Sequence, residues 1–124
     1  MQTEEIDTII KDRAALDSTE AAHKAGTGVL AELSRLNLGS EAREIGAQLP
    51  EGYKEALASG EASEDLTKDE LLSRVESALD LDREAAARVT HATLSVIADA
   101  VTPGERVSFL NALPEDISGL AVWN

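Results

Sequence analysis

The residues of this 124-residue chain that could do chemistry are mainly carboxylates, because cysteine is absent and histidine occurs twice. Neither His23 nor His91 is followed four residues later by a histidine or carboxylate that could complete a zinc or catalytic motif. Serine is plentiful, but no Gly-x-Ser-x-Gly sequence marks a nucleophile. We therefore predict no catalytic residue, cofactor or metal, and interpret both histidines as ordinary, partly exposed helix residues.

Acidic residues come in close pairs that could hold a cation or exchange a proton. These pairs are Glu41 with Glu44, Asp80 with Asp82, and Glu115 with Asp116. Most lie at predicted helix starts, where negative charge complements the helix dipole, and no calcium-binding loop pattern occurs. We therefore expect no metal site, and we predict that a partner contacts Glu41, Glu44, Glu115 and Asp116.

A glycine pair, Gly26-Thr27-Gly28, falls inside a helical pattern. A phosphate-binding loop would follow a strand, and none is predicted before this segment. Glycine inside a helix costs about 1 kcal/mol relative to alanine. The pattern therefore favours a packing role, in which another helix passes close to these glycines.

The chain carries a net charge of −13, from 24 acidic and 11 basic residues. This charge argues against direct binding to nucleic acid or to an anionic membrane surface, since both require lysine and arginine. Three interpretations stay open: general solubility, a salt-rich cytosol, or a basic partner. No signal peptide or transmembrane stretch is evident, so we predict a cytoplasmic protein.

The positioning elements follow from an internal repeat. Residues 17–57 align with 81–121 at an offset of 64, and residues 3–15 align with 67–79 at an offset of 65. The identical pairs include Glu20 with Glu84, Leu30 with Leu94, and Glu41 with Glu105. Such a period indicates two copies of one helical unit, neither of which could cover its apolar face alone.

Apolar residues recur at helical spacing, and no segment alternates with the period of a strand. We expect helices over 3–15, 19–36, 67–79 and 83–101, a third helix in each half ending near Gln48 or Ala112, and a short last helix beginning at Pro50 or Pro114. The predicted fold is all-α: a duplicated three-to-four-helix unit forming one pseudo-twofold bundle. Residues 1–124 form a single domain, with repeats at about 3–57 and 67–121 and an acidic connector at 58–66.

Leu49-Pro50-Glu51 and Leu113-Pro114-Glu115 each follow an acidic-capped, alanine-rich helix, and residues 79–86 read LDLDREAA. Over about residues 4–121 these motifs resemble the uncharacterised prokaryotic family called domain of unknown function 2267. The second repeat matches the family pattern better than the first. The resemblance implies an all-α duplicated domain from bacteria or haloarchaea, with no catalytic residues to transfer.

These observations favour a non-enzymatic protein-interaction or regulatory module whose expected partner is another protein, with a basic protein as one candidate. The alternative is a carrier that binds a small ligand in a pocket between the two repeats. We expect no enzyme activity, because no set of side chains has the spacing of a catalytic site.

Overall fold

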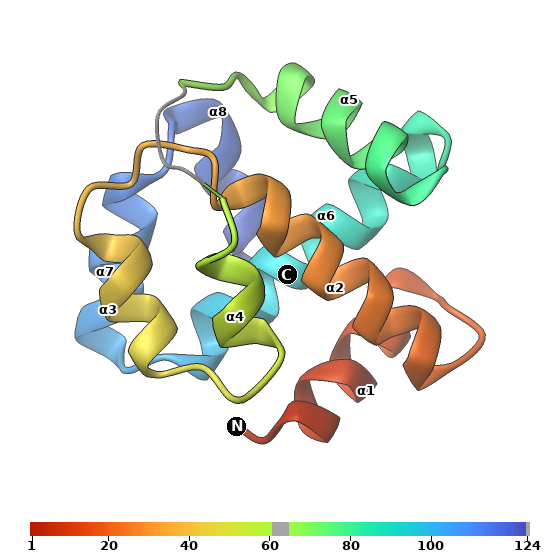
Figure 1. Cartoon of the computed structure of the whole chain (residues 1–124), viewed down its shortest axis with the longest axis horizontal. Coiled ribbons are helices and arrows are strands. Elements are labelled where there is room, and N and C mark those ends of the chain that lie inside the picture. Colours follow the sequence, from red (N-terminus) through yellow and green to blue (C-terminus); the bar gives the residue numbers. More distant parts are fainter. Residues whose placement is uncertain (61–64, 124) are drawn as a thin grey trace.

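The computed structural model describes residues 1–60 and 65–123, and within these ranges the chain forms helices and no strand (Figure 1). The all-α prediction is therefore confirmed for the described residues. None of their helices has the length and apolar character needed to span a bilayer. The predicted connector 58–66 includes residues 61–64, which lie outside the described ranges.

Both halves of the chain contribute helices in the same order. The first half contains α1 (Thr3–Ala14), α2 (Thr19–Leu33), α3 (Glu41–Ala47) and α4 (Tyr53–Leu57). The second half contains α5 (Lys68–Leu79), α6 (Arg83–Ala100), α7 (Pro103–Ala112), α8 (Glu115–Ser118) and a single 3-10 turn, η1 (Gly119–Ala121).

Local capping explains where several helices begin. The Ser18 hydroxyl accepts the Ala21 N–H at 3.0 Å before α2, and the Asp82 carboxylate accepts the Ala85 N–H at 2.8 Å before α6. Thr67 and Glu70 accept each other's backbone N–H groups at the start of α5. Each contact satisfies an N–H that has no partner within the helix, so these starts could be read from the sequence.

Two predicted boundaries were wrong. The short helix of the first half begins at Tyr53 rather than Pro50, because Gly52 has a φ of 92°, which lies outside the helical region.

We expected the first long helix to continue to Leu36, but α2 ends at Leu33. The Ser34 hydroxyl donates to the Ala31 carbonyl at 2.6 Å, and the Leu36 N–H bonds to the Leu33 carbonyl at 2.9 Å. A hydroxyl that competes for a helix carbonyl favours a turn over continued helix, which accounts for the early end.

The two long helices α2 and α6 contact each other at the centre of the molecule. Helix α1 packs on both α2 and α6, and α5 packs on the same two helices. Helix α4 covers α2, the turn η1 covers α6, and α3 lies beside α7 (Figure 1). Leu30 of α2 and Leu94 of α6 are fully buried in one apolar cluster that contains residues from both halves.

The predicted packing role of the glycine pair is confirmed. A Cβ atom on Gly26 would lie 2.7 Å from Ile10 Cδ1 and 2.9 Å from Tyr53 Cε1, and one on Gly28 would lie 2.7 Å from Leu79 Cδ2. The absence of side chains at these two positions therefore lets α1, α4 and α5 approach α2 closely.

Candidate functional site

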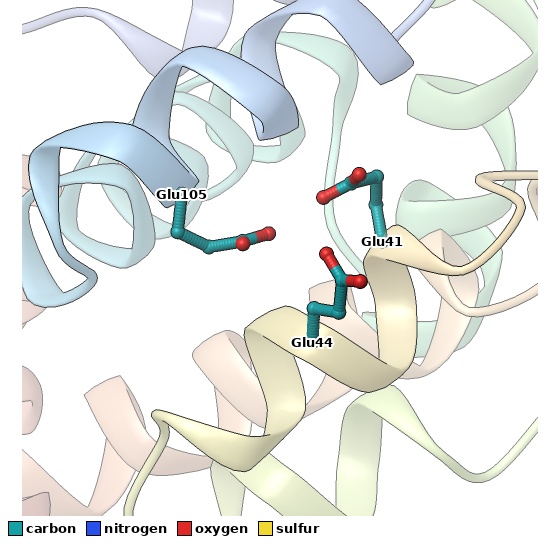
Figure 2. A group of neighbouring side chains, drawn as sticks. All are labelled: Glu41, Glu44 and Glu105. Carbon is teal, nitrogen blue, oxygen red and sulfur yellow. The ribbon is translucent and has the colours of Figure 1, made fainter.

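Three glutamates from two helices converge where α3 meets α7. Glu41 and Glu44 come from α3 and Glu105 comes from the first turn of α7, and their side chains point toward one another (Figure 2). One oxygen from each carboxylate lies within 4.8 Å of the others. Glu41 and Glu105 are half-buried and Glu44 is exposed. We call these three residues the acidic cluster.

Local helix geometry places the cluster. Residues three apart lie on the same face of a helix, so Glu41 and Glu44 face α7 together. Glu105 lies in the first turn of α7, where the Thr102 hydroxyl accepts its N–H at 3.3 Å. Because α3 and α7 are in contact, their packing brings Glu105 close to Glu41 and Glu44.

The cluster lacks compensating positive charge. With all three carboxylates ionised, Glu41 Oε2 and Glu105 Oε1 are shielded from solvent and have no hydrogen-bond donor, and no base among the described residues pairs with the cluster. The nearby Arg106 is directed elsewhere, since its Nε donates to the Ala98 carbonyl at 2.9 Å. The cluster therefore presents concentrated negative charge with unused acceptor atoms.

This environment raises the pKa of Glu105 to about 7. The main cause is a hydrogen bond with Glu41 that requires a proton, followed by partial burial and by the negative charges of Glu41 and then Glu44. Chemically, the cluster can share a proton near neutral pH or accept a cation with oxygen-seeking preferences, such as an ammonium group or a hard metal ion.

The sequence prediction named two of these three glutamates. Glu105 was missed as a site residue, although its identity with Glu41 in the internal repeat was a usable signal. The other predicted pair lies elsewhere: Asp116 Oδ2 accepts the Lys68 N–H at 2.7 Å, and Glu115 is exposed. Among the described residues, no hydrogen bond or ion pair joins Glu115 or Asp116 to the acidic cluster.

A second polar group was missed entirely. Asp7 on α1 is only 9% exposed, and its Oδ1 accepts a hydrogen bond from the fully buried Tyr53 hydroxyl. The same oxygen lies 3.0 Å from His23 Nδ1, and the His23 ring meets the Tyr53 ring edge-on at 5.4 Å. Burial, then the hydrogen bond and charge of Asp7, raise the pKa of Tyr53.

This Asp7–His23–Tyr53 network has an evident structural purpose. A buried tyrosine hydroxyl needs a hydrogen-bond acceptor, and Asp7 supplies it. His23 is held by the same carboxylate, and its side chain is 40% exposed beside a shallow cleft of 370 Å³. Among residues 1–60 and 65–123, the hydrogen bond of the His23 imidazole is the one with Asp7, and no serine, threonine or lysine bonds to the ring.

An open pocket lies on the face of α3 that turns away from α7. Its volume is 540 Å³, and α3, α4 and the segment after α2 enclose it. Its walls include Ala42, Gly46 and Leu57, and the bases Arg43 and Lys54 also line it. We call this cavity the α3 pocket. It belongs to the first half of the chain.

A smaller cavity of 180 Å³ lies between the halves, where α2 faces α5 and α6. Its lining is mainly apolar, including Leu79 and Leu81, with Lys24 and Arg88 also present. A second hollow between the halves, of 480 Å³, lies where α2 faces α5, and its lining includes Glu32, Ser73 and Ser77. The α3 pocket is larger than either of these cavities, although the sequence led us to expect a ligand pocket between the repeats.

Comparison with known proteins gives a family but no activity. No curated protein matches the sequence. A family model described as "Uncharacterized conserved protein (DUF2267)" matches residues 3–120, nearly the whole chain. The resemblance seen in the repeated Leu-Pro-Glu motifs is thereby confirmed, and the chain belongs to the DUF2267 family of uncharacterized conserved proteins.

Proposed function

We propose that this protein is a non-enzymatic interaction module that binds a basic segment of another protein. The observation that carries the proposal is the acidic cluster, in which two shielded carboxylate oxygens have no hydrogen-bond donor once all three glutamates are ionised. Lysine or arginine side chains from a partner would supply the missing donors and positive charge. The net charge of −13 would also attract such a partner over a distance and increase its rate of association.

Glu115 and Asp116 lie apart from the acidic cluster, and we propose that they contribute less to partner binding. Asp116 already accepts the Lys68 N–H at the start of α5, so less of its charge is available to a partner. The exposed Glu115 has no such engagement among the described residues.

The proposal can be tested with a lysine-rich peptide as the probe. Calorimetric titration should show binding that weakens as sodium chloride rises, because salt screens exposed charges. The double variant Glu41→Gln/Glu44→Gln should bind the peptide several-fold more weakly, and Glu115→Gln/Asp116→Asn should show a smaller loss. A matched control, Glu4→Gln/Asp17→Asn, removes the same charge from two exposed positions outside the cluster.

Equal losses in the cluster variant and the control would overturn the proposed surface, because only the overall charge would then matter. Titration with Ca²⁺ and Mg²⁺ alone separates a metal site from a protein surface. Tight binding of either ion that is lost in Glu105→Gln would replace the partner hypothesis.

We also propose that the two halves form a duplicated unit related by a pseudo-twofold axis. Three features support this: α1 and α5 each pack on both long helices, α2 contacts α6, and α3 contacts α7. Glu41 and Glu105 occupy equivalent repeat positions and meet each other, as equivalent residues do beside a twofold axis. A single domain and a cytoplasmic location stay predictions.

The alternative of a ligand carrier with its pocket between the repeats has less support. Small-molecule pockets usually measure about 300–1,000 Å³. One cavity between the halves measures 180 Å³ and is smaller than that range. Another, at 480 Å³, lies within the range, but polar side chains such as Glu32, Arg35 and Ser73 line most of it, whereas ligand pockets are mostly apolar.

A further inference from the structure

We propose that the α3 pocket binds a small organic anion with an apolar body, such as an aliphatic carboxylate. This site is separate from the acidic cluster, because the two lie on different faces of α3. The proposal rests on how the pocket is opened, what lines it, and where positive charge is available.

Small residues open the pocket. Gly46 is helical and buried, yet a Cβ atom added to it would meet nothing within 4 Å. A buried glycine normally marks a close approach of another chain segment, as Gly26 does in this protein. At Gly46 the missing side chain instead leaves a space that opens into the pocket.

The fold does not require this space. At the positions 64 residues later, Ala42 and Gly46 are replaced by Arg106 and Leu110. Arg106 donates to the Ala98 carbonyl at 2.9 Å, and Leu110 packs against the core. A helix of the same kind therefore accepts large side chains at these positions, and packing alone does not explain why α3 carries small ones.

The charges favour an anion. Arg43 and Lys54 line the pocket from α3 and α4, and neither forms an ion pair with a described residue. The neighbouring Glu55 accepts the Gly52 N–H at 2.7 Å through its Oε1 and also interacts electrostatically with Lys54, so Arg43 is the less compensated of the two bases. Two available bases stand out in a chain with more than twice as many acidic as basic residues.

The walls favour an apolar body attached to that anionic group. Ala42, Ala47 and Leu57 give the pocket an apolar lining, and its volume of 540 Å³ lies within the usual range for small-molecule sites. Burial of a hydrocarbon chain against these residues, with the carboxylate near Arg43 and Lys54, would satisfy both parts of the ligand.

Decanoate is a suitable probe, and decanol is its uncharged counterpart. Nuclear magnetic resonance titration of the protein should show decanoate shifting the backbone signals of α3 and α4, with binding about tenfold tighter than that of decanol. Failure of decanoate to bind at millimolar concentration, or equal binding of decanol, would overturn the proposal.

A filled-pocket variant tests the location. Gly46→Leu places the residue found at position 110 into the open space and should weaken decanoate binding more than tenfold, while thermal denaturation shows an intact fold. Gly104→Leu is the matched control, because a Cβ at Gly104 also meets nothing within 4 Å and this residue does not line the pocket. The control should bind decanoate as the unmodified protein does.

Charge variants test the anion. Arg43→Gln and Lys54→Gln should each weaken decanoate binding up to about fivefold, the effect of an exposed charge worth about 1 kcal/mol. Lys24→Gln, which alters the cavity between the halves, should have no effect. A loss in Lys24→Gln with none in Arg43→Gln or Lys54→Gln would place the ligand between the halves and overturn this site.

Discussion

The two halves of the chain bury different polar side chains, and those of the second half include Thr90, Thr93 and Ser95. In the first half, Asp7, His23 and Tyr53 form a hydrogen-bonded network between α1, α2 and α4. The corresponding positions of the second half, 64 or 65 residues later, hold the apolar residues Leu72, Ala87 and Ile117. The second half therefore shows that this helical arrangement can be built without the polar network.

The halves also differ in helix length and in the size of the side chains on α3 and α7. Helices α6 and α7 have 18 and 10 residues, whereas α2 and α3 have 15 and 7. The shorter α3 carries the small residues that open the α3 pocket, and the longer α7 carries Arg106 and Leu110 instead. The first half therefore has a pocket and a buried network that packing does not require, whereas the second half contributes Glu105 to the acidic cluster.

The largest expected effect tests whether the halves share one core equally. Leu30 and Leu94 are equivalent in the repeat and both are fully buried. Either leucine changed to alanine should lower the free energy of unfolding by about 2–5 kcal/mol, as core leucines generally do. Urea denaturation measures the free energy of unfolding of both variants. A loss below about 1 kcal/mol at both positions would break the shared-core assignment.

The polar network should have the next largest effect. Asp7→Ala leaves the buried Tyr53 hydroxyl without its acceptor and should cost about 1–3 kcal/mol of stability. Removing both partners in Asp7→Ala/Tyr53→Phe should cost less than the sum of the single changes, because no orphaned group remains. Additive losses in a double-mutant cycle would show that the two residues do not depend on each other.

The acidic cluster predicts a pH dependence. The pKa of Glu105 is about 7 in the folded protein, against an ordinary value of 4.5. Between these values the folded state binds a proton that the unfolded chain releases, so this contribution to stability is present below pH 4.5 and lost as pH rises through about 7.

Because Glu105 is partly exposed, the loss should be on the order of 1 kcal/mol after solvent screening. Glu105→Gln should therefore flatten this part of the stability profile and make the protein more stable at pH 8. Urea denaturation from pH 4 to pH 8 measures the profile. An unchanged slope in the variant would mean that the meeting of Glu41 with Glu105 has no energetic consequence.

The smallest effect concerns the open space beside α3. Gly46 is a helical residue without positive φ and without neighbours at its Cβ position. Gly46→Ala should therefore stabilise the protein by about 0.5–1 kcal/mol through helix propensity alone. Gly26→Ala should instead destabilise the protein, because the added Cβ would collide with Ile10 and Tyr53. Thermal denaturation measures the change in stability of each variant. If both variants were stabilised, or both destabilised, the proposed difference in packing would be contradicted.

Several features of the fold could be predicted from the sequence. The starts of α2, α5 and α6 depend on caps only three residues from the N–H groups that they accept, so the local sequence contains the whole interaction. The close packing at Gly26 and Gly28 was also predicted, because two glycines inside a helix need a reason. The end of α2 was misjudged, because an apolar pattern does not reveal that Ser34 turns back to Ala31.

The site was harder to predict, and the reason is distance along the chain. The sequence alone was enough for several helix starts, the acidic charge and the family motifs, since these depend on neighbouring residues or on composition. Asp7 and Tyr53 are 46 residues apart, so their hydrogen bond depends on how α1 and α4 pack against α2. Likewise, Glu105 joins Glu41 only because α3 lies against α7, and the α3 pocket exists only because no neighbouring segment fills the space beside Gly46.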